Sequence, residues 1–146
     1  MTLTPRDLDF EQIKIGDVFS FKKLIDGRLI GRFAKLVGDY NPLHMNAAYA
    51  KENGFENRLA HGLLIGSLFS TLVGMFCPGR RALYLSQSLN FKKPVVMGKE
   101  ILIKGKVLNK SESTKIIRLE TLACDDKGVI VVEGEALVKV RSQIKT

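Results

Sequence analysis

The sequence predicts an α+β domain over residues 1–146, in which a mostly antiparallel sheet of four or five strands packs against one strongly apolar helix. Two observations predict this fold class. Residues 62–77 carry no charged side chain and are apolar almost all round, which indicates a helix that is covered on every side. After Pro78 and Gly79 the hydrophobic pattern changes to a period of two residues, which is typical of strands.

The N-terminal part predicts a strand followed by a helix. Residues 13–24 partly alternate between apolar and polar and therefore predict the strand. Asp26 and Gly27 then offer a turn and a helix cap. Apolar residues at helical spacing follow and predict an amphipathic helix that runs to about Val37.

A loop and a second short helix are expected next. Gly38 ends the first helix, and Pro42 prevents its simple continuation, so residues 38–44 are predicted to form a loop. Residues 46–53 predict a short helix with Asn46 as its N-cap.

The C-terminal half supplies the remaining strands, which are predicted over residues 81–91, 100–109, 115–124 and 129–141. A single sheet with one covered face favours pairing through its edge, so a homodimer is expected. Small residues three or four apart form a stripe along the apolar helix, where another backbone or a long thin ligand can approach closely.

The net charge of +8 is concentrated in residues 80–115, which hold nine basic and two acidic side chains. Such a segment suits a phosphate-bearing ligand, an acidic carrier protein or simply a solvated sheet face. Nucleic acid is not an expected partner, because the chain has no Trp and does not interleave aromatic with basic residues.

A cytoplasmic protein without a membrane partner is expected. Residues 62–78 are too short and too rich in small polar residues for a typical span, and residues 1–11 show no secretory leader. Cys77 and Cys124 are interpreted as small buried hydrophobic residues, because their number and spacing suggest neither a disulfide framework nor a zinc site.

Asp39 and His44 are the first candidate catalytic pair. They are five residues apart in the loop that Pro42 bends, so both side chains can turn toward one point. A carboxylate and a mostly neutral imidazole can hold a water molecule, one taking its proton and the other donating one later. The alternative is a purely structural pair in which Asp39 caps a turn and His44 bonds the backbone.

His61 and Gly62 mark the start of the apolar helix. Free N–H groups at a helix start suit a developing oxyanion, and Gly62 has no side chain to block a close approach. His61 can equally satisfy a polar group at the helix end. A zinc site built from His44, His61 and a cysteine is not expected, because no ligand spacing matches one.

Three segments together, 38–44 (GDYNPLH), 60–64 (AHGLL) and 84–95 (YLSQSLNFKKPV), resemble the MaoC-like (R)-specific enoyl-CoA hydratases. The resemblance extends from about Ile13 to Val140. It implies a hot-dog fold, usually dimeric, in which the sheet wraps around the helix at 62–77. It also implies a reversible hydro-lyase that needs no metal or cofactor and converts a trans-2-enoyl thioester of CoA, or of an acyl carrier protein, to the (3R)-hydroxyacyl thioester.

The resemblance also implies roles for individual residues. Asp39 and His44 would be the catalytic acid/base pair, and Asn41 would help fix the substrate or the loop. The N–H of Gly62 would bind the thioester carbonyl, while Ser70 and Val73 would line the acyl pocket.

Three other functions remain open at this point. A hot-dog acyl-CoA thioesterase shares the fold and the substrate, although residues 62–77 lack the helical carboxylate that such enzymes often use. A non-catalytic acyl-CoA-binding protein would be expected to have lost Asp39 or His44, and both are present. A basic nucleic-acid-binding domain would require strongly salt-dependent binding to DNA or RNA.

Overall fold

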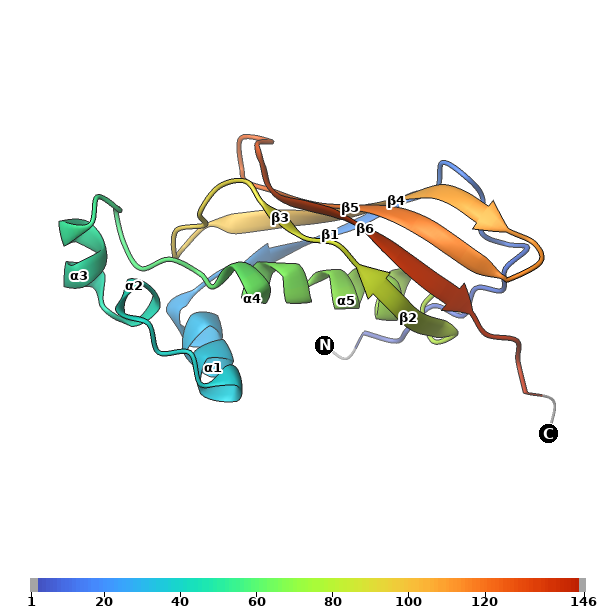
Figure 1. Cartoon of the computed structure of the whole chain (residues 1–146), viewed down its shortest axis with the longest axis horizontal. Coiled ribbons are helices and arrows are strands. Elements are labelled where there is room, and N and C mark those ends of the chain that lie inside the picture. Colours follow the sequence, from blue (N-terminus) through green and yellow to red (C-terminus); the bar gives the residue numbers. More distant parts are fainter. Residues whose placement is uncertain (1–2, 145–146) are drawn as a thin grey trace.

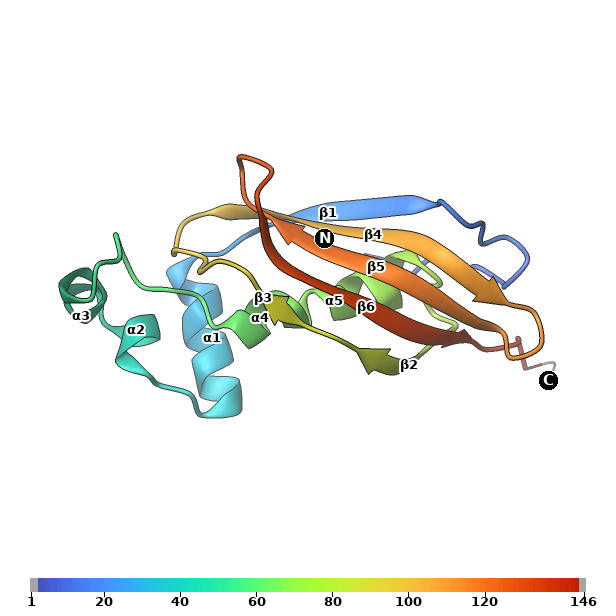
Figure 2. The ribbon, with the colours of Figure 1, turned by 45° about the horizontal axis from the view of Figure 1, so that its top comes forward.

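An antiparallel sheet lies along one side of an apolar helical run. The first helix of the chain lies beneath one end of the sheet, and two shorter helices stand beyond that end (Figures 1 and 2). The computed structural model describes residues 3–144, so the outermost residues of the predicted 1–146 domain lie outside the described part. This arrangement confirms the predicted α+β class and is that of the hot-dog fold. Among residues 3–144, no helix is both long enough and apolar enough to cross a membrane.

The sheet follows the order β1-β4-β5-β6-β2, with every neighbouring pair antiparallel. A sixth, two-residue strand, β3, pairs with β6 beyond the end of β2. The strands are β1 (Val18–Leu24), β2 (Ala82–Gln87), β3 (Asn90–Phe91), β4 (Glu100–Ser111), β5 (Ile116–Cys124) and β6 (Ile130–Val140). On β4 the buried side chains alternate at Ile101, Ile103 and Val107, as the period of two predicts.

Two predicted strands are shorter or divided. Residues 13–17 form a turn rather than the start of β1, because Gly16 adopts a φ of 93° and the N–H of Asp17 donates to the Lys14 carbonyl. The predicted strand 81–91 is two strands, β2 and β3. It breaks where the Ser88 carbonyl comes so close to Gly134 of β6 that a Cβ at position 134 would lie 1.8 Å from that oxygen.

The first helix, α1 (Gly27–Val37), begins and ends as predicted. The Asp26 side chain accepts a hydrogen bond of 2.8 Å from the N–H of Leu29 at the N-terminus. Gly38 follows the last turn with a φ of 80°, a left-handed conformation that glycine adopts without steric cost.

The prediction of a loop throughout 38–44 is wrong, because residues 42–45 form the short helix α2 (Pro42–Met45). Asn41 caps this helix by accepting from the N–H of Leu43, and Pro42 lies in the first turn, where its missing N–H has no role. The third helix, α3 (Ala47–Glu52), has the predicted N-cap, Asn46.

The apolar helix predicted over 62–77 is a run of three segments: α4 (Gly62–Ser67), α5 (Phe69–Thr71) and the π-helical turn η1 (Leu72–Phe76). The Ser67 hydroxyl donates to the Leu64 carbonyl at 2.6 Å. This is the carbonyl that the N–H of Leu68 would use in a regular helix, and that N–H instead bonds Ile65, three residues back. A local side-chain bond therefore accounts for the first break.

The helical run is buried on one face only. Ile65, Phe69 and Leu72 pack in the core beneath the sheet. Leu63, at 61% exposure, and the exposed residues Ser67 and Ser70 lie on the opposite side. The expectation that the helix is covered all round is therefore wrong for this face, which we call the open helix face (Leu63, Ser67 and Ser70).

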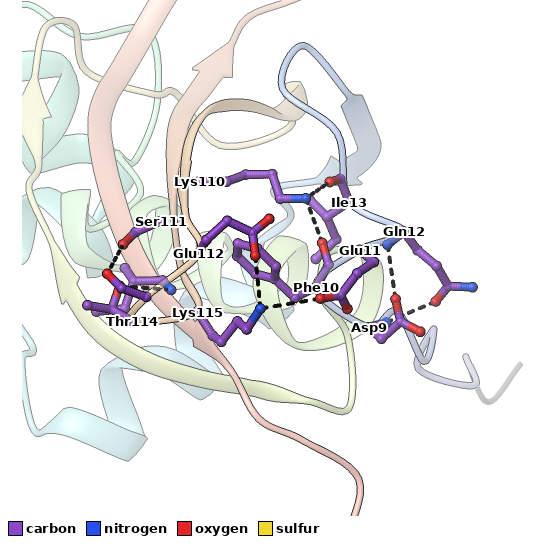
Figure 3. A network of polar contacts seen from close by, with 12 residues as sticks. Asp9, Phe10, Glu11, Gln12, Ile13, Lys110, Ser111, Glu112, Thr114 and Lys115 are labelled. Carbon is purple, nitrogen blue, oxygen red and sulfur yellow. Dashed lines mark hydrogen bonds and ion pairs between the residues drawn. The ribbon is translucent and has the colours of Figure 1, made fainter.

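The N-terminal segment is bound by the C-terminal end of β4 and by the turn that leads from β4 to β5 (Figure 3). The Phe10 side chain is buried, and the ammonium groups of Lys110 and Lys115 lie 4.3 and 4.6 Å from the centre of its ring. Lys110 also donates to the backbone carbonyls of Phe10, at 2.7 Å, and Ile13. Lys115 pairs with Glu11 at 3.3 Å. We call this group the N-terminal clamp (Phe10, Glu11, Ile13, Lys110 and Lys115).

Candidate active site

Asp39, His44 and His61 meet at the end of the molecule that carries the short helices. The left-handed Gly38 turns the chain out of α1, and Asp39 Oδ1 then accepts a hydrogen bond of 3.1 Å from the N–H of Asn41. His44 follows on α2, while His61 directly precedes α4. The structure therefore brings the predicted Asp39/His44 pair together and adds His61 to it.

The three side chains are close enough to share one water molecule or one reacting atom. Asp39 Oδ2 lies 3.9 Å from His44 Nε2 and 4.0 Å from His61 Nε2. The two imidazole rings are stacked, with their centres 3.8 Å apart. The Asp39 side chain is half exposed, that of His44 is 17% exposed and that of His61 only 3%. Solvent thus reaches the carboxylate and His44 more readily than His61.

Backbone carbonyls fix the tautomers of both imidazoles, because a carbonyl can only accept a hydrogen bond. His44 Nδ1 lies 2.8 Å from the Leu59 carbonyl and must carry a proton. In neutral His44 the lone pair is therefore on Nε2, the nitrogen nearer to Asp39. His61 Nε2 lies 3.0 Å from the Asp39 carbonyl and must likewise be the donor. His44 is consequently the imidazole that can take a proton at the site.

Gly62 presents its N–H at the start of α4. The hydrogen bonds to the His61 carbonyl come from Leu64 and Ile65, and within residues 3–144 the N–H of Gly62 has no hydrogen-bond partner. A Cβ at position 62 would lie 2.9 Å from the Phe91 ring, so glycine is the residue that fits beside that ring without displacing it. The N–H can therefore bind an oxygen atom that approaches it.

A cavity of about 680 Å³ joins these groups, a volume in the range of small-molecule sites. Asp39, His44, His61 and Gly62 form part of its wall, and Lys92 and Lys93 form another part. The rest is mostly apolar, made by Phe33, Val37, Ala60, Leu63, Ile65, Phe91, Pro94, Val95 and Val132. Lys92 also pairs with Glu133 at 3.3 Å. An apolar chain with an anionic end matches this lining.

The remaining predicted residues lie elsewhere. The Asn41 side chain caps α2, which agrees with a role in fixing the loop. Ser70 lies on the open helix face, whereas Val73 is buried in the core at 1% exposure. Neither lines the cavity of the single chain over the residues that the structure describes, so their place in an acyl pocket stays a prediction.

Asp39, His44 and His61 also offer atoms within 4.8 Å of one another, a spacing at which a metal ion can bind. One nitrogen of each imidazole is already used as a donor to a carbonyl. The free ligands at the shared point are thus His44 Nε2 and the Asp39 carboxylate, one fewer than the three protein ligands of a typical catalytic zinc site. The geometry favours proton transfer over metal binding.

Sequence reasoning did not identify Phe33 and Phe91 as part of the site. Phe33 packs against His61, with ring centres 5.0 Å apart, and Phe91 lies against Gly62. Phe91 belongs to the 84–95 segment of the family resemblance, and that segment is the sequence feature that could have indicated its place in the site. Phe33 is one of the apolar residues of the predicted amphipathic helix, a pattern that by itself does not indicate a site.

The comparisons with known proteins identify the family and the fold. The family described as "MaoC like domain" matches residues 14–126. An (R)-specific enoyl-CoA hydratase from Aeromonas caviae is 37% identical over 130 residues, which are 89% of this chain and 97% of that protein. A mitochondrial 3-hydroxyacyl-[acyl-carrier-protein] dehydratase from Arabidopsis thaliana is 35% identical over 127 residues, 85% of this chain and 75% of that one.

A solved structure of an R-hydratase from Pseudomonas aeruginosa superposes with a TM-score of 0.91 at 30% identity, covering 97% of this chain and 93% of that one. The fold and the comparisons define a MaoC-like hot-dog enzyme of the hydro-lyase class. The chain belongs to the MaoC-like family.

Proposed function

We propose that the chain catalyses the reversible, (R)-specific hydration of trans-2-enoyl-CoA to (3R)-hydroxyacyl-CoA. The observation that carries this proposal is that a carboxylate, an imidazole lone pair and an open backbone N–H lie on the wall of one mostly apolar cavity. The names of the Aeromonas and Pseudomonas relatives support the same reaction.

The reaction requires two proton transfers and the stabilisation of one negative charge, and three groups of the site can provide them. Water must lose a proton as its oxygen bonds to C3, C2 must gain a proton, and negative charge must be stabilised on the thioester carbonyl. Asp39 and His44 hold the water, accept its proton and return one proton to C2, so the pair ends the cycle unchanged. The N–H of Gly62 binds the carbonyl oxygen, where the charge develops.

The acyl carrier is proposed to be CoA, with an acyl carrier protein as the second candidate. Lys92 and Lys93 on the cavity wall suit the phosphate groups of either carrier. The Aeromonas relative is named for a CoA thioester, whereas the Arabidopsis relative is named for an acyl carrier protein.

We also propose a homodimer in a cytoplasmic, reducing environment. The open helix face and the exposed side chains of Leu83 and Leu85 on edge strand β2 support association with a second copy. The two cysteines are both free thiols, which is in accord with a reducing compartment.

The deciding experiment is hydration of crotonyl-CoA, followed by loss of the enoyl absorbance. The product is coupled separately to an (R)-specific and an (S)-specific 3-hydroxyacyl-CoA dehydrogenase. Signal from the (R) enzyme alone is expected. Release of free CoA without hydration would instead identify a thioesterase.

Asp39→Asn and His44→Asn test the assigned pair. Each is expected to lower kcat by about 10²- to 10⁴-fold, because each removes one proton-transferring group. Asn at position 44 can still donate to the Leu59 carbonyl, so the loop should keep its anchor. Asp126→Asn, which removes an exposed carboxylate that does not line the cavity, is the control. Near-wild-type hydration by either test variant would refute the mechanism.

A further inference from the structure

His61 is a buried polar residue whose hydrogen bonding is incomplete. Its ring is 3% exposed and contacts the rings of Phe33 and His44. Its Nε2–H donates to the Asp39 carbonyl, but its Nδ1 has no hydrogen-bond partner among the described residues. A buried nitrogen without a partner destabilises the fold relative to an apolar ring of the same shape. The stability of the core therefore does not explain a histidine at this position.

Several hydrogen bonds to residues 58–59 hold His44 in place. Its Nδ1–H donates to the Leu59 carbonyl, and its own carbonyl accepts from Arg58 Nε. The adjacent Leu43 carbonyl accepts from the N–H of Leu59 at 2.9 Å. Loss of any one of these bonds leaves the others to hold His44 in place.

Among residues 3–144, Asp39 makes a single hydrogen bond to a residue outside its own loop. Its Oδ1 accepts from Asn41, two residues along the chain, which stabilises the local turn but does not tie it to the rest of the molecule. Over residues 3–144 the hydrogen bond from His61 Nε2 to the Asp39 carbonyl is the one that crosses from the loop to the start of α4. The position of the Asp39 carboxylate thus depends on His61 far more than the position of His44 does.

We propose that His61 is a positioning residue that holds Asp39 in place for proton transfer through the hydrogen bond to its backbone carbonyl. This inference rests on the proposed hydration. Because Gly62 is the next residue, the same bond also fixes the carboxylate relative to the N–H that receives the thioester carbonyl. A misplacement of about 1 Å at such a site can lower a rate by about 100-fold.

Two substitutions separate the hydrogen bond from the ring. His61→Phe keeps an aromatic ring against His44 and Phe33 but has no donor. His61→Gln loses the ring, but its side-chain amide can donate at a similar reach. We expect His61→Phe to lower kcat by about 100-fold with KM within about threefold of wild type, and His61→Gln to recover most of that loss.

Stability gives a second, independent readout. Phe removes the unpartnered nitrogen, which stabilises the fold, but it also removes the donor to the Asp39 carbonyl, which destabilises it. Because the two effects oppose each other, the urea midpoint of His61→Phe is expected to lie close to that of wild type. Ile30→Val is the matched control, because Ile30 is fully buried on α1 and does not line the cavity. Its shortening is expected to lower stability alone. That variant should unfold at lower urea with an unchanged kcat. His61→Leu, a second variant without a donor, replaces His61→Phe if the phenyl ring does not fit.

The outcomes distinguish the inference from the proposed function. A wild-type protein that does not hydrate enoyl-CoA would refute the function. A wild-type enzyme that hydrates, with His61→Phe or His61→Leu equally active, would overturn the positioning role alone. So would a His61→Gln variant as slow as His61→Phe, or a loss of activity that only accompanies a loss of stability.

Discussion

Replacing Gly62 with proline removes a single backbone N–H while leaving the helix start intact. The preceding residue, His61, has φ −60° and ψ 134°, a conformation that a following proline favours. Position 62 is the first residue of α4, where proline is well tolerated and its N–H makes no hydrogen bond within the described chain. The obstacle is the Phe91 ring, 2.9 Å from where a Cβ would lie.

A Phe91→Ala background removes that obstacle and allows a clean comparison. In this background, Gly62→Ala adds a Cβ and keeps the N–H, whereas Gly62→Pro adds a ring and loses it. If the N–H binds the developing oxyanion, its removal raises the barrier by about 2.7–4 kcal/mol. The kcat of the proline variant should then be about 10²- to 10³-fold below that of the alanine variant.

The assay is steady-state hydration of crotonyl-CoA by Phe91→Ala and by the two double variants, which carry Gly62→Ala or Gly62→Pro in addition. Urea unfolding then checks that the two double variants are similarly stable. Equal kcat values for the alanine and proline variants would show that the carbonyl is not held by the Gly62 N–H. The role of Asp39 and His44 would survive that result, but the assignment of the oxyanion site would not.

Three further predictions concern stability, pH and reactivity. Gly134→Ala should lower the free energy of unfolding by roughly 3 kcal/mol or more in urea, because the new Cβ would collide with the Ser88 carbonyl. The hydrogen-bonded Arg81 guanidinium lowers the pKa of the Asp7 carboxyl below its ordinary value of 3.8. The stabilisation that Asp7→Asn removes should therefore be present above pH 3.8 and disappear as the pH falls through the lowered pKa. Burial raises the pKa of the Cys77 thiol to about 12, so iodoacetamide should label Cys77 only after unfolding, as read by mass spectrometry.

Two of these predictions have an internal reference. Gly31→Ala adds a methyl group into open space within α1 and should stabilise the protein by about 0.5–1 kcal/mol, opposite in sign to Gly134→Ala. Cys124, which is only partly buried, should react faster than Cys77 in the folded protein. A Cys77 that is labelled as fast as Cys124, or an Asp7→Asn effect that grows in acid, would contradict the packing described above.

Features set by neighbours in the chain were predictable from the sequence. Asp26 and Asn46 cap their helices through hydrogen bonds that span three residues, and Gly38 ends α1 through its own backbone conformation. Features set by contacts distant in sequence were not. The break in the strand predicted over 81–91 depends on the approach of Ser88 to Gly134, and no pattern in the local sequence predicts that contact.

The same distinction applies to the candidate site. The bend at Pro42 was sufficient to predict that Asp39 and His44 approach each other, because both lie in one short segment. The hydrogen bond from His61 to Asp39 joins residues 22 apart and depends on how α4 enters the core. A role for Ser70 and Val73 stays a prediction, because the cavity of the single chain does not include them.

The N-terminal clamp has a consequence for the order in which the chain folds. Its hydrogen bonds and ion pair join residues 97 to 104 positions apart, and closing a loop of that length costs about 4 kcal/mol of chain entropy. Such contacts are expected to form after the β4–β5 and β5–β6 hairpins, whose partners are close in sequence. Lys110→Met should then speed unfolding and leave the folding rate almost unchanged, so the clamp determines how long the native state persists.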